Sequence, residues 1–208
     1  MKNLIMGTIF LFVHTILYAQ KERIAFTYGE FRAGYGVNSF GDGLKEKYNA
    51  GNFATSRGGL ASLALYRKFK QIDYFNFGIK YKSLGAAPAK GDNGQEFFFN
   101  YWGAAFSTKF FPFDHTAQKG LYLQADYFFI TQFTQKYRNT ANLDFNHQFA
   151  IGNGLAFGLG YDVAIGKGRT MLTFGLEYET DSRTGEVSSI GDKNFKSSNF
   201  GILTGIKF

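Results

Sequence analysis

The feature that most constrains this chain is the two-residue alternation of its last eleven residues, 198–208, which read SNFGILTGIKF. One set of alternate positions is mostly large and apolar, and the other set is mostly small or polar. This period is typical of a β-strand, because successive side chains of a strand point to opposite faces of its sheet. The chain is therefore predicted to end in a strand with one apolar face. The positions of that face are Phe200, Ile202, Thr204, Ile206 and Phe208.

Similar alternation recurs along most of the chain, between connections rich in turn-forming residues. The connection at 71–73 is very short, whereas 38–58, 85–96 and 181–197 are long and polar. In the first alternating stretch the apolar residues change parity, which predicts a β-bulge near Gly29. The predicted strands are 23–37, 60–70, 74–84, 97–111, 120–136, 142–165, 169–180 and 198–208.

The composition limits the class of protein. Aromatic residues make up 19% of the 208 residues, yet the mean hydropathy is only −0.19. This combination is typical of strands that present lipid-facing and interior residues in alternation. The absence of cysteine excludes a disulfide framework and thiolate metal sites. The formal charge is +7, but Lys and Arg are scattered singly rather than clustered, so we expect no nucleic-acid partner.

The terminal strand closing on Phe208 resembles the last strand of bacterial outer-membrane β-barrels, where it is the signal read by the barrel-assembly machinery. In architecture the chain is similar to the small eight-stranded barrels of the OmpA, OmpX and OmpW type, most like those of Bacteroidetes in its aromatic-rich strands. The resemblance implies an all-β, eight-stranded antiparallel transmembrane up-and-down β-barrel in the bacterial outer membrane, with both termini periplasmic. Its implied contacts are outer-membrane lipid, lipopolysaccharide and, during insertion, the assembly machinery.

The stretch 142–165 allows two interpretations. It can form one long strand with Gly152-Asn153-Gly154 as a bulge, or two strands with that tripeptide as a turn. With both termini on one side of a membrane the strand count must be even. One long strand brings the total to eight and a split brings it to nine, so the single strand is favoured.

The N-terminal residues 1–19 are predicted to be a cleaved signal peptide, which leaves 20–208 as the barrel. Lys2 supplies the positive charge, 4–17 is apolar, and Ala19 is a small residue suited to cleavage before Gln20. The alternative is an uncleaved anchor, because an uncharged run of this length approaches the ~20 residues that span a bilayer.

The interior positions of the predicted strands carry many charges. An eight-stranded barrel is just wide enough for side chains to fill it, and charges removed from water need partners. We therefore favour a salt-bridged plug over a polar conduit, with bases mostly on the first four strands and acids mostly on strands five to seven. The predicted network consists of Glu30, Arg32, Lys80, Lys82, Lys109, Asp126, Asp162, Glu177 and Glu179.

Little in the sequence points to catalysis. After removal of the leader only His115 and His147 remain, and neither has ligand-like spacing to a second His or to a Cys. No G-x-S-x-G nucleophile elbow occurs. We predict no catalytic, metal-binding or cofactor-binding residues, no cofactor and no enzymatic activity.

The fifth and sixth predicted strands are longer than a membrane requires. A tilted strand crosses with about 10 residues, so the tip shared by 120–136 and 142–165 is expected to project beyond the outer leaflet. There it would expose unpaired strand edges, which are templates for another chain, and apolar side chains. The alternative is that the aromatics contact lipopolysaccharide or the protein's own loops. The candidate partner residues are Phe133, Tyr137, Phe145 and Phe149.

Three classes of function remain open at this level. The favoured class is a structural or protein-interaction role, as in an accessory subunit of an outer-membrane assembly or secretion complex that binds another outer-membrane protein. The second class is a narrow porin for small solutes. The third is a lipid-modifying outer-membrane enzyme, for which His147 is the only candidate histidine.

Overall fold

The computed structural model describes nine segments of the chain: 26–40, 55–69, 72–86, 89–90, 96–113, 119–138, 145–165, 169–187 and 191–208. The predicted signal peptide and His115 lie outside these segments. Among the described residues, no helix is long and apolar enough to cross a membrane. The strands are β1 (Phe26–Phe40), β2 (Thr55–Lys68), β3 (Phe75–Ala86), β4 (Ala89–Lys90), β5 (Glu96–Phe110), β6 (Gly120–Arg138), β7 (Phe145–Ala164), β8 (Met171–Val187) and β9 (Gly191–Lys207).

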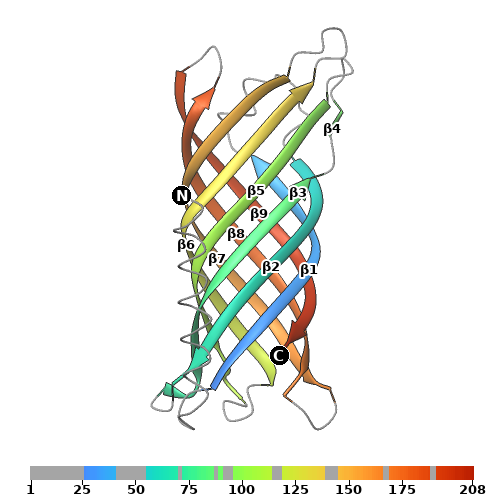
Figure 1. The fold of residues 1–208 in the computed structure, drawn as a ribbon, viewed down its shortest axis with the longest axis vertical. Helices are drawn as coiled ribbons and strands as arrows, with labels where there is room; N and C mark the ends of the chain where they lie inside the picture. The colour runs from blue at the N-terminus through green and yellow to red at the C-terminus, as the bar shows by residue number, and fades with distance from the viewer. Residues whose placement is uncertain are drawn as a thin grey trace, which may run out of the picture.

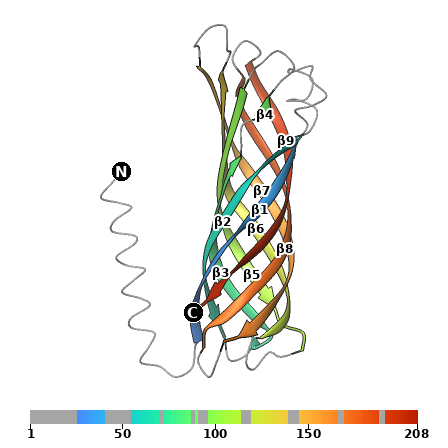
Figure 2. The ribbon, with the colours of Figure 1, turned by 90° about the vertical axis from the view of Figure 1, so that its right-hand side faces the viewer.

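The eight long strands form a closed antiparallel barrel (Figure 1). Each long strand pairs with the next along the chain, β3 pairs with β5, and β1 pairs with β9 to complete the ring. The two-residue β4 pairs only with the upper part of β5. The predicted eight-stranded antiparallel barrel is confirmed. Figure 2 places the C-terminus at the same end as the beginning of β1.

The barrel is closed at its last residue. The Phe208 amide donates to the Gly29 carbonyl at 2.9 Å, and the Gly29 amide donates to the Phe208 carbonyl at 2.8 Å. A Cβ atom on Gly29 would lie 2.7 Å from the Phe208 ring, so this glycine leaves space for the terminal aromatic side chain. The five predicted terminal-strand positions all face outward; the exposed fraction of Phe208 is 61%.

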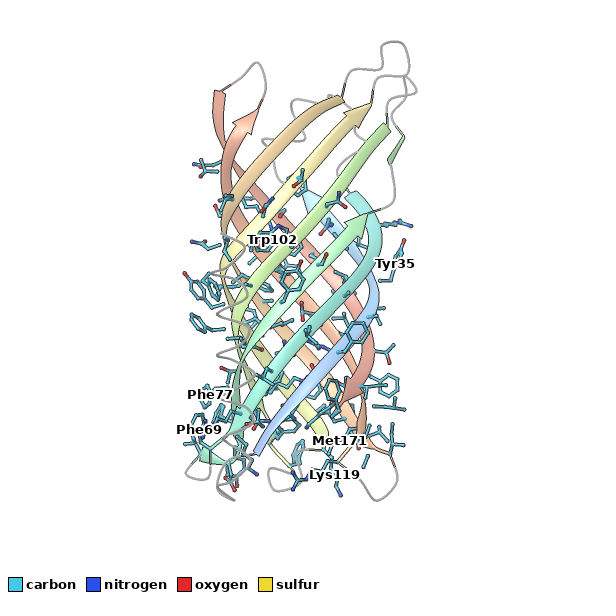
Figure 3. All side chains as sticks on the ribbon, viewed as in Figure 1. Tyr35, Phe69, Phe77, Trp102, Lys119 and Met171 are labelled. Carbon is cyan, nitrogen blue, oxygen red and sulfur yellow. The ribbon has the colours of Figure 1, made fainter. Side chains whose placement is uncertain are left out.

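Alternation along each strand separates an apolar outer surface from a polar interior. Outward aromatic side chains such as Tyr35, Phe69 and Phe77 project from the wall in Figure 3, and between 39% and 54% of their surface is exposed. Inward charged side chains of the same strands, such as Arg32 and Lys80, are almost fully buried. In water such an outer surface would be unusually apolar.

The predicted bulge near Gly29 is wrong. The β1–β2 register runs without interruption from Phe26 to Ser39. Tyr28 points inward, where its ring stacks on Tyr66 with centroids 5.2 Å apart. The change of parity in the sequence therefore reflects an aromatic side chain inside the barrel rather than an extra residue.

The stretch 145–164 is one strand, as the even count favoured, but Gly152-Asn153-Gly154 is not the bulged segment. The extra residue belongs to β6, because Phe128 pairs with Gly154 and Thr131 with Gly152, which leaves two residues opposite Asn153. Phe129 and Ile130 thus both lie outside the barrel, while Phe128 and Thr131 both point inward. The bulge reverses the parity of β6 beyond this point.

The predicted loop 181–197 is also wrong. Strands β8 and β9 continue as a paired ladder through most of this range, as far as Val187 opposite Gly191. The outward residues of β8 above Tyr178 are Thr180, Ser182 and Thr184, so the strand loses its apolar face without ending. Strands β5 to β9 consequently rise above the upper ends of β1 to β3 (Figure 1).

Tyr122 is accommodated inside the barrel by glycines on the neighbouring strands. A Cβ atom on Gly160 would lie 2.2 Å from the Tyr122 ring and 2.5 Å from the Phe174 carbonyl oxygen, whereas one on Gly59 would meet no atom within 4 Å. We expect Gly160→Ala to destabilise the barrel by about 1–3 kcal/mol, the usual cost of overpacking. The matched Gly59→Ala should leave the free energy of unfolding nearly unchanged. Urea unfolding in detergent, followed by the fluorescence of the single tryptophan, Trp102, measures both variants. Equal stability of the two variants would contradict the close approach.

Candidate functional site

The centre of the lumen contains an ion-pair cluster around Glu177 on β8. The Lys80 ammonium, on the opposite wall, lies 2.7 Å from Asp126 and also contacts Glu177. Lys82 lies 2.7 Å from Glu177 and pairs with Glu179 as well. All five side chains are at most 3% exposed. Their attraction connects β3 directly to β6 and β8 across the interior.

The lower lumen extends the same network. Glu30 on β1 lies 3.0 Å from Arg32 and contacts Lys109 of β5. A guanidinium nitrogen of Arg32 lies 3.6 Å from Glu177, which joins this group to the central cluster. The Lys109 ammonium also lies 4.0 Å from the centroid of the Tyr122 ring, in a cation–π arrangement.

The end of the lumen near the termini is filled by Lys207 and aromatic rings. The Lys207 ammonium lies 3.2 Å from Asp162, 4.4 Å from the centroid of the Tyr28 ring and 4.9 Å from that of Phe111. All four side chains are at most 2% exposed. The structure thus places all nine predicted network residues inside the barrel, each in an ion pair.

Three charged members of the lumen were missed by the sequence analysis: Asp181, Arg183 and Lys207. Lys207 already stood on the inward parity of the terminal strand, which was sufficient to find it. Asp181 and Arg183 fell in a predicted loop. With them, the buried charges of the described residues comprise six acids and six bases. They are Glu30, Asp126, Asp162, Glu177, Glu179 and Asp181, with Arg32, Lys80, Lys82, Lys109, Arg183 and Lys207.

An apolar layer lies next to the central cluster. It consists of Leu60, Leu84, Tyr101 and Leu203, each at most 7% exposed. The Leu60 side chain packs against two glycines. A Cβ atom added to Gly36 would lie 2.6 Å from the Leu60 side chain, and one added to Gly201 would lie 2.4 Å from it. The Tyr101 hydroxyl donates to Glu179, so the apolar layer and the ion pairs are directly connected.

Above this layer, Arg183 of β8 spans the upper lumen. Its guanidinium lies 2.7 Å from Asp181, and it donates to the Thr131 hydroxyl at 2.9 Å and to the Ser197 hydroxyl. The guanidinium carbon lies 4.8 Å from the centroid of the Tyr101 ring and 6.0 Å from that of Phe133. Arg183 therefore links β8 to β5, β6 and β9.

The contact with Arg183 corrects the predicted role of Phe133. This side chain is 6% exposed and points into the barrel, so it does not offer a surface to a partner. The reason is the bulge at Phe129, which reverses the parity on which the prediction depended. Tyr137, Phe145 and Phe149 lie on β6 and β7 near the tip of this hairpin, and their role as partner contacts stays a prediction.

The predicted unpaired edges of the hairpin formed by β6 and β7 are mostly paired. β6 pairs with β5 as far as Arg138 opposite Glu96, and β7 pairs with β8 from Phe149 opposite Glu186. These pairings were not expected because the strand predicted at 169–180 stopped short, whereas β8 continues to Val187. Any partner of this hairpin would thus meet its faces and tip rather than a free edge.

Metal-binding geometry is not found in the described part of the chain, where no three His, Cys, Asp or Glu side chains come together in a way that could hold an ion. The buried carboxylates are instead neutralised by Lys and Arg. The lumen is arranged as a packed, charge-balanced interior.

An eight-stranded antiparallel barrel with an apolar exterior and a filled, charged interior has the fold of the small outer-membrane β-barrels. Two solved structures show this likeness. Neisserial surface protein A is 14% identical with a TM-score of 0.51, covering 88% of this chain and 97% of that one. Ail, the attachment invasion locus protein of Yersinia pestis, is 10% identical with a TM-score of 0.54, covering 88% and 99%. No protein-family model and no curated protein matches the chain.

The central cluster predicts strong coupling between Glu177 and Lys82. Glu177→Gln removes the anion that Lys80, Lys82 and Arg32 share and leaves a net buried positive charge, and we expect it to lower the free energy of unfolding by about 3–5 kcal/mol. Lys82→Met should have a similar effect, and the double variant should lose less than the sum, because neither charge then remains unpaired. Urea unfolding of the reconstituted barrel measures all three variants. Strictly additive losses would show that the two side chains do not interact.

Proposed function

We propose that this protein is an outer-membrane barrel with a structural or protein-interaction role, which it performs at its projecting rim rather than through its lumen. In this proposal residues 1–19 direct export, the outward apolar surface contacts lipid, and both termini lie in the periplasm. The barrel would serve as an accessory subunit that binds another outer-membrane protein. The observation that carries the proposal is the filled lumen.

Buried side chains of the described residues occupy the lumen at successive levels between Lys207 and Arg183. From the end near the termini upward it contains the Lys207 layer, the ion-pair cluster, the Leu60 layer and the Arg183 links. A conducting pore would need a continuous polar path. Here Leu60, Leu84, Tyr101 and Leu203 interrupt the polar interior, and the charged groups neighbouring them are already paired.

The height of the rim supports an interaction role. Strands β6 and β7 have 19 and 20 residues, about twice the number that a membrane crossing requires. Strands β8 and β9 have 17 each, and the outward residues of β8 above Tyr178 are polar. In outer-membrane barrels the longer extensions are extracellular, which supports placing the termini in the periplasm.

Conductance distinguishes this proposal from a narrow porin. The wild-type protein in a planar bilayer should show no conductance steps above the protein-free bilayer, because the described apolar and ion-paired side chains interrupt the polar interior. Steps that change in size when Lys82 is replaced by methionine would identify the lumen as the conducting path and would contradict the proposal.

Removal of the projecting tip of β6 and β7 tests the interaction role. Gln135 and Gln148 pair with each other, so replacing 136–147 by Asn-Gly preserves the register and keeps Thr131 and Phe133 in contact with Arg183. We expect a folded, heat-modifiable barrel that no longer co-purifies partner proteins from mild detergent. The matched control replaces 184–194 by Asn-Gly, between the paired Arg183 and Phe195, and should retain them. Full partner yield after the first replacement would place the contact elsewhere.

A further inference from the structure

The outward face of β2 carries two arginines with only small or apolar residues between them. Arg57 and Arg67 are both exposed, and the outward positions between them are Gly59, Ala61, Leu63 and Leu65. Ten residues of strand span roughly 33 Å, which is about 25 Å along the axis of a barrel whose strands are tilted by about 40°. This is the height of the apolar band of an outer-membrane barrel. The two arginines therefore mark the two edges of that band.

Arg67, at the edge nearer the termini, lies beside aromatic side chains. Its guanidinium carbon lies 5.5 Å from the centroid of the Phe69 ring, and Phe77 stands directly opposite it on β3. No ion pair within the described segments includes Arg67. A cation on the lipid face costs free energy that increases toward the middle of the membrane. An anion supplied from outside the chain would reduce this cost.

A groove in the barrel wall begins directly above Arg67. It has a volume of about 420 Å³, and Leu65, its first residue on β2, is the next outward residue after Arg67. The short side chain of Ala104 leaves the groove open on β5, and the outward ring of Phe129, at the bulge of β6, closes its far side. The outward residues that line it are Gly29, Leu63, Leu65, Ile79, Tyr81, Ala104 and Phe129.

We propose that this wall holds one glycerophospholipid, with its phosphate on Arg67 and an acyl chain in the groove. The inference rests on the proposed membrane location and orientation, which place Arg67 at the periplasmic leaflet. Arginine matches phosphate because its planar guanidinium can donate two parallel hydrogen bonds. The groove offers a hydrocarbon chain apolar walls, and Arg67 offers the charge complement at the end where the headgroup must lie.

Native mass spectrometry of the purified barrel in mild detergent tests the site, with dioleoyl-phosphatidylglycerol as the added probe. The wild-type protein should retain one lipid. Arg67→Gln should reduce the retained fraction about tenfold, the effect of losing one charge-assisted interaction. Arg57→Gln is the matched control on the same strand and face, and it should retain lipid like the wild type. Ala104→Phe, which fills the groove, should also reduce retention. Dioleoylglycerol, which lacks the phosphate, should be held equally by the wild type and by Arg67→Gln.

Two results would overturn the site. One is equal retention of the phospholipid by the wild type and Arg67→Gln, and the other is an equal loss in Arg57→Gln and Arg67→Gln. Heat-modifiability of every variant shows that the barrel is folded when lipid is lost. Membrane fractionation tests the proposed location separately. A barrel found outside the outer membrane would contradict the proposed function, whereas unchanged lipid retention by Arg67→Gln would contradict only the site.

Discussion

The rest of the structure depends on the ion pairs that cross the lumen at Glu177. This carboxylate, on β8, contacts Lys80 and Lys82 of β3 and lies 3.6 Å from Arg32 of β1. These four side chains are at most 2% exposed, so each charge is tolerable only when its partners are present. The partners meet only after β1 pairs with β9 and β3 pairs with β5. Closure of the barrel and neutralisation of its interior are therefore one event.

The interior is also matched in shape. Large inward side chains stand over glycines: Tyr122 over Gly160, Leu60 over Gly201, and Phe128 over Gly103. A Cβ atom at these glycines would lie between 2.2 and 2.7 Å from the facing side chain. Because protein interiors are packed at the density of organic crystals, a narrow barrel can contain aromatic rings and long cations only if other positions carry no side chain. Charge balance and glycine placement together leave a solid interior.

Because the interior is filled, the surfaces left for contact with other molecules are the outer wall and the rim. The wall offers an apolar exterior with arginines at the two edges of its band, and the rim offers strands that extend well beyond the band. Arg183 ties β8 to β5, β6 and β9 at the base of this extension. Such links make the rim a continuation of the barrel rather than a set of separate loops, so a partner would meet a preorganised surface.

The sequence by itself determined the strand period, the number of strands and the inward position of most lumen charges. Alternation in Lys80 and Lys82 or in Glu177 and Glu179 is local, because it follows from the geometry of each strand alone. The tertiary structure decided the register. In β6 the run Tyr127-Phe128-Phe129-Ile130 is apolar on both parities. Only the pairing of β5, where Ala104 is opposite Ile130 and the next residue, Ala105, is opposite Phe128, shows that Phe129 is the extra residue.

That single register shift turned Phe133 from an expected partner contact into a lumen side chain. The extent of β8 and β9 beyond the apolar band was likewise a tertiary matter, since a strand with polar outward residues has no apolar period and is recognised only by its ladder. Local alternation can be recognised from consecutive residues of the sequence alone. Register and strand length depend on hydrogen bonds between residues far apart in the chain, and one sequence does not display those bonds.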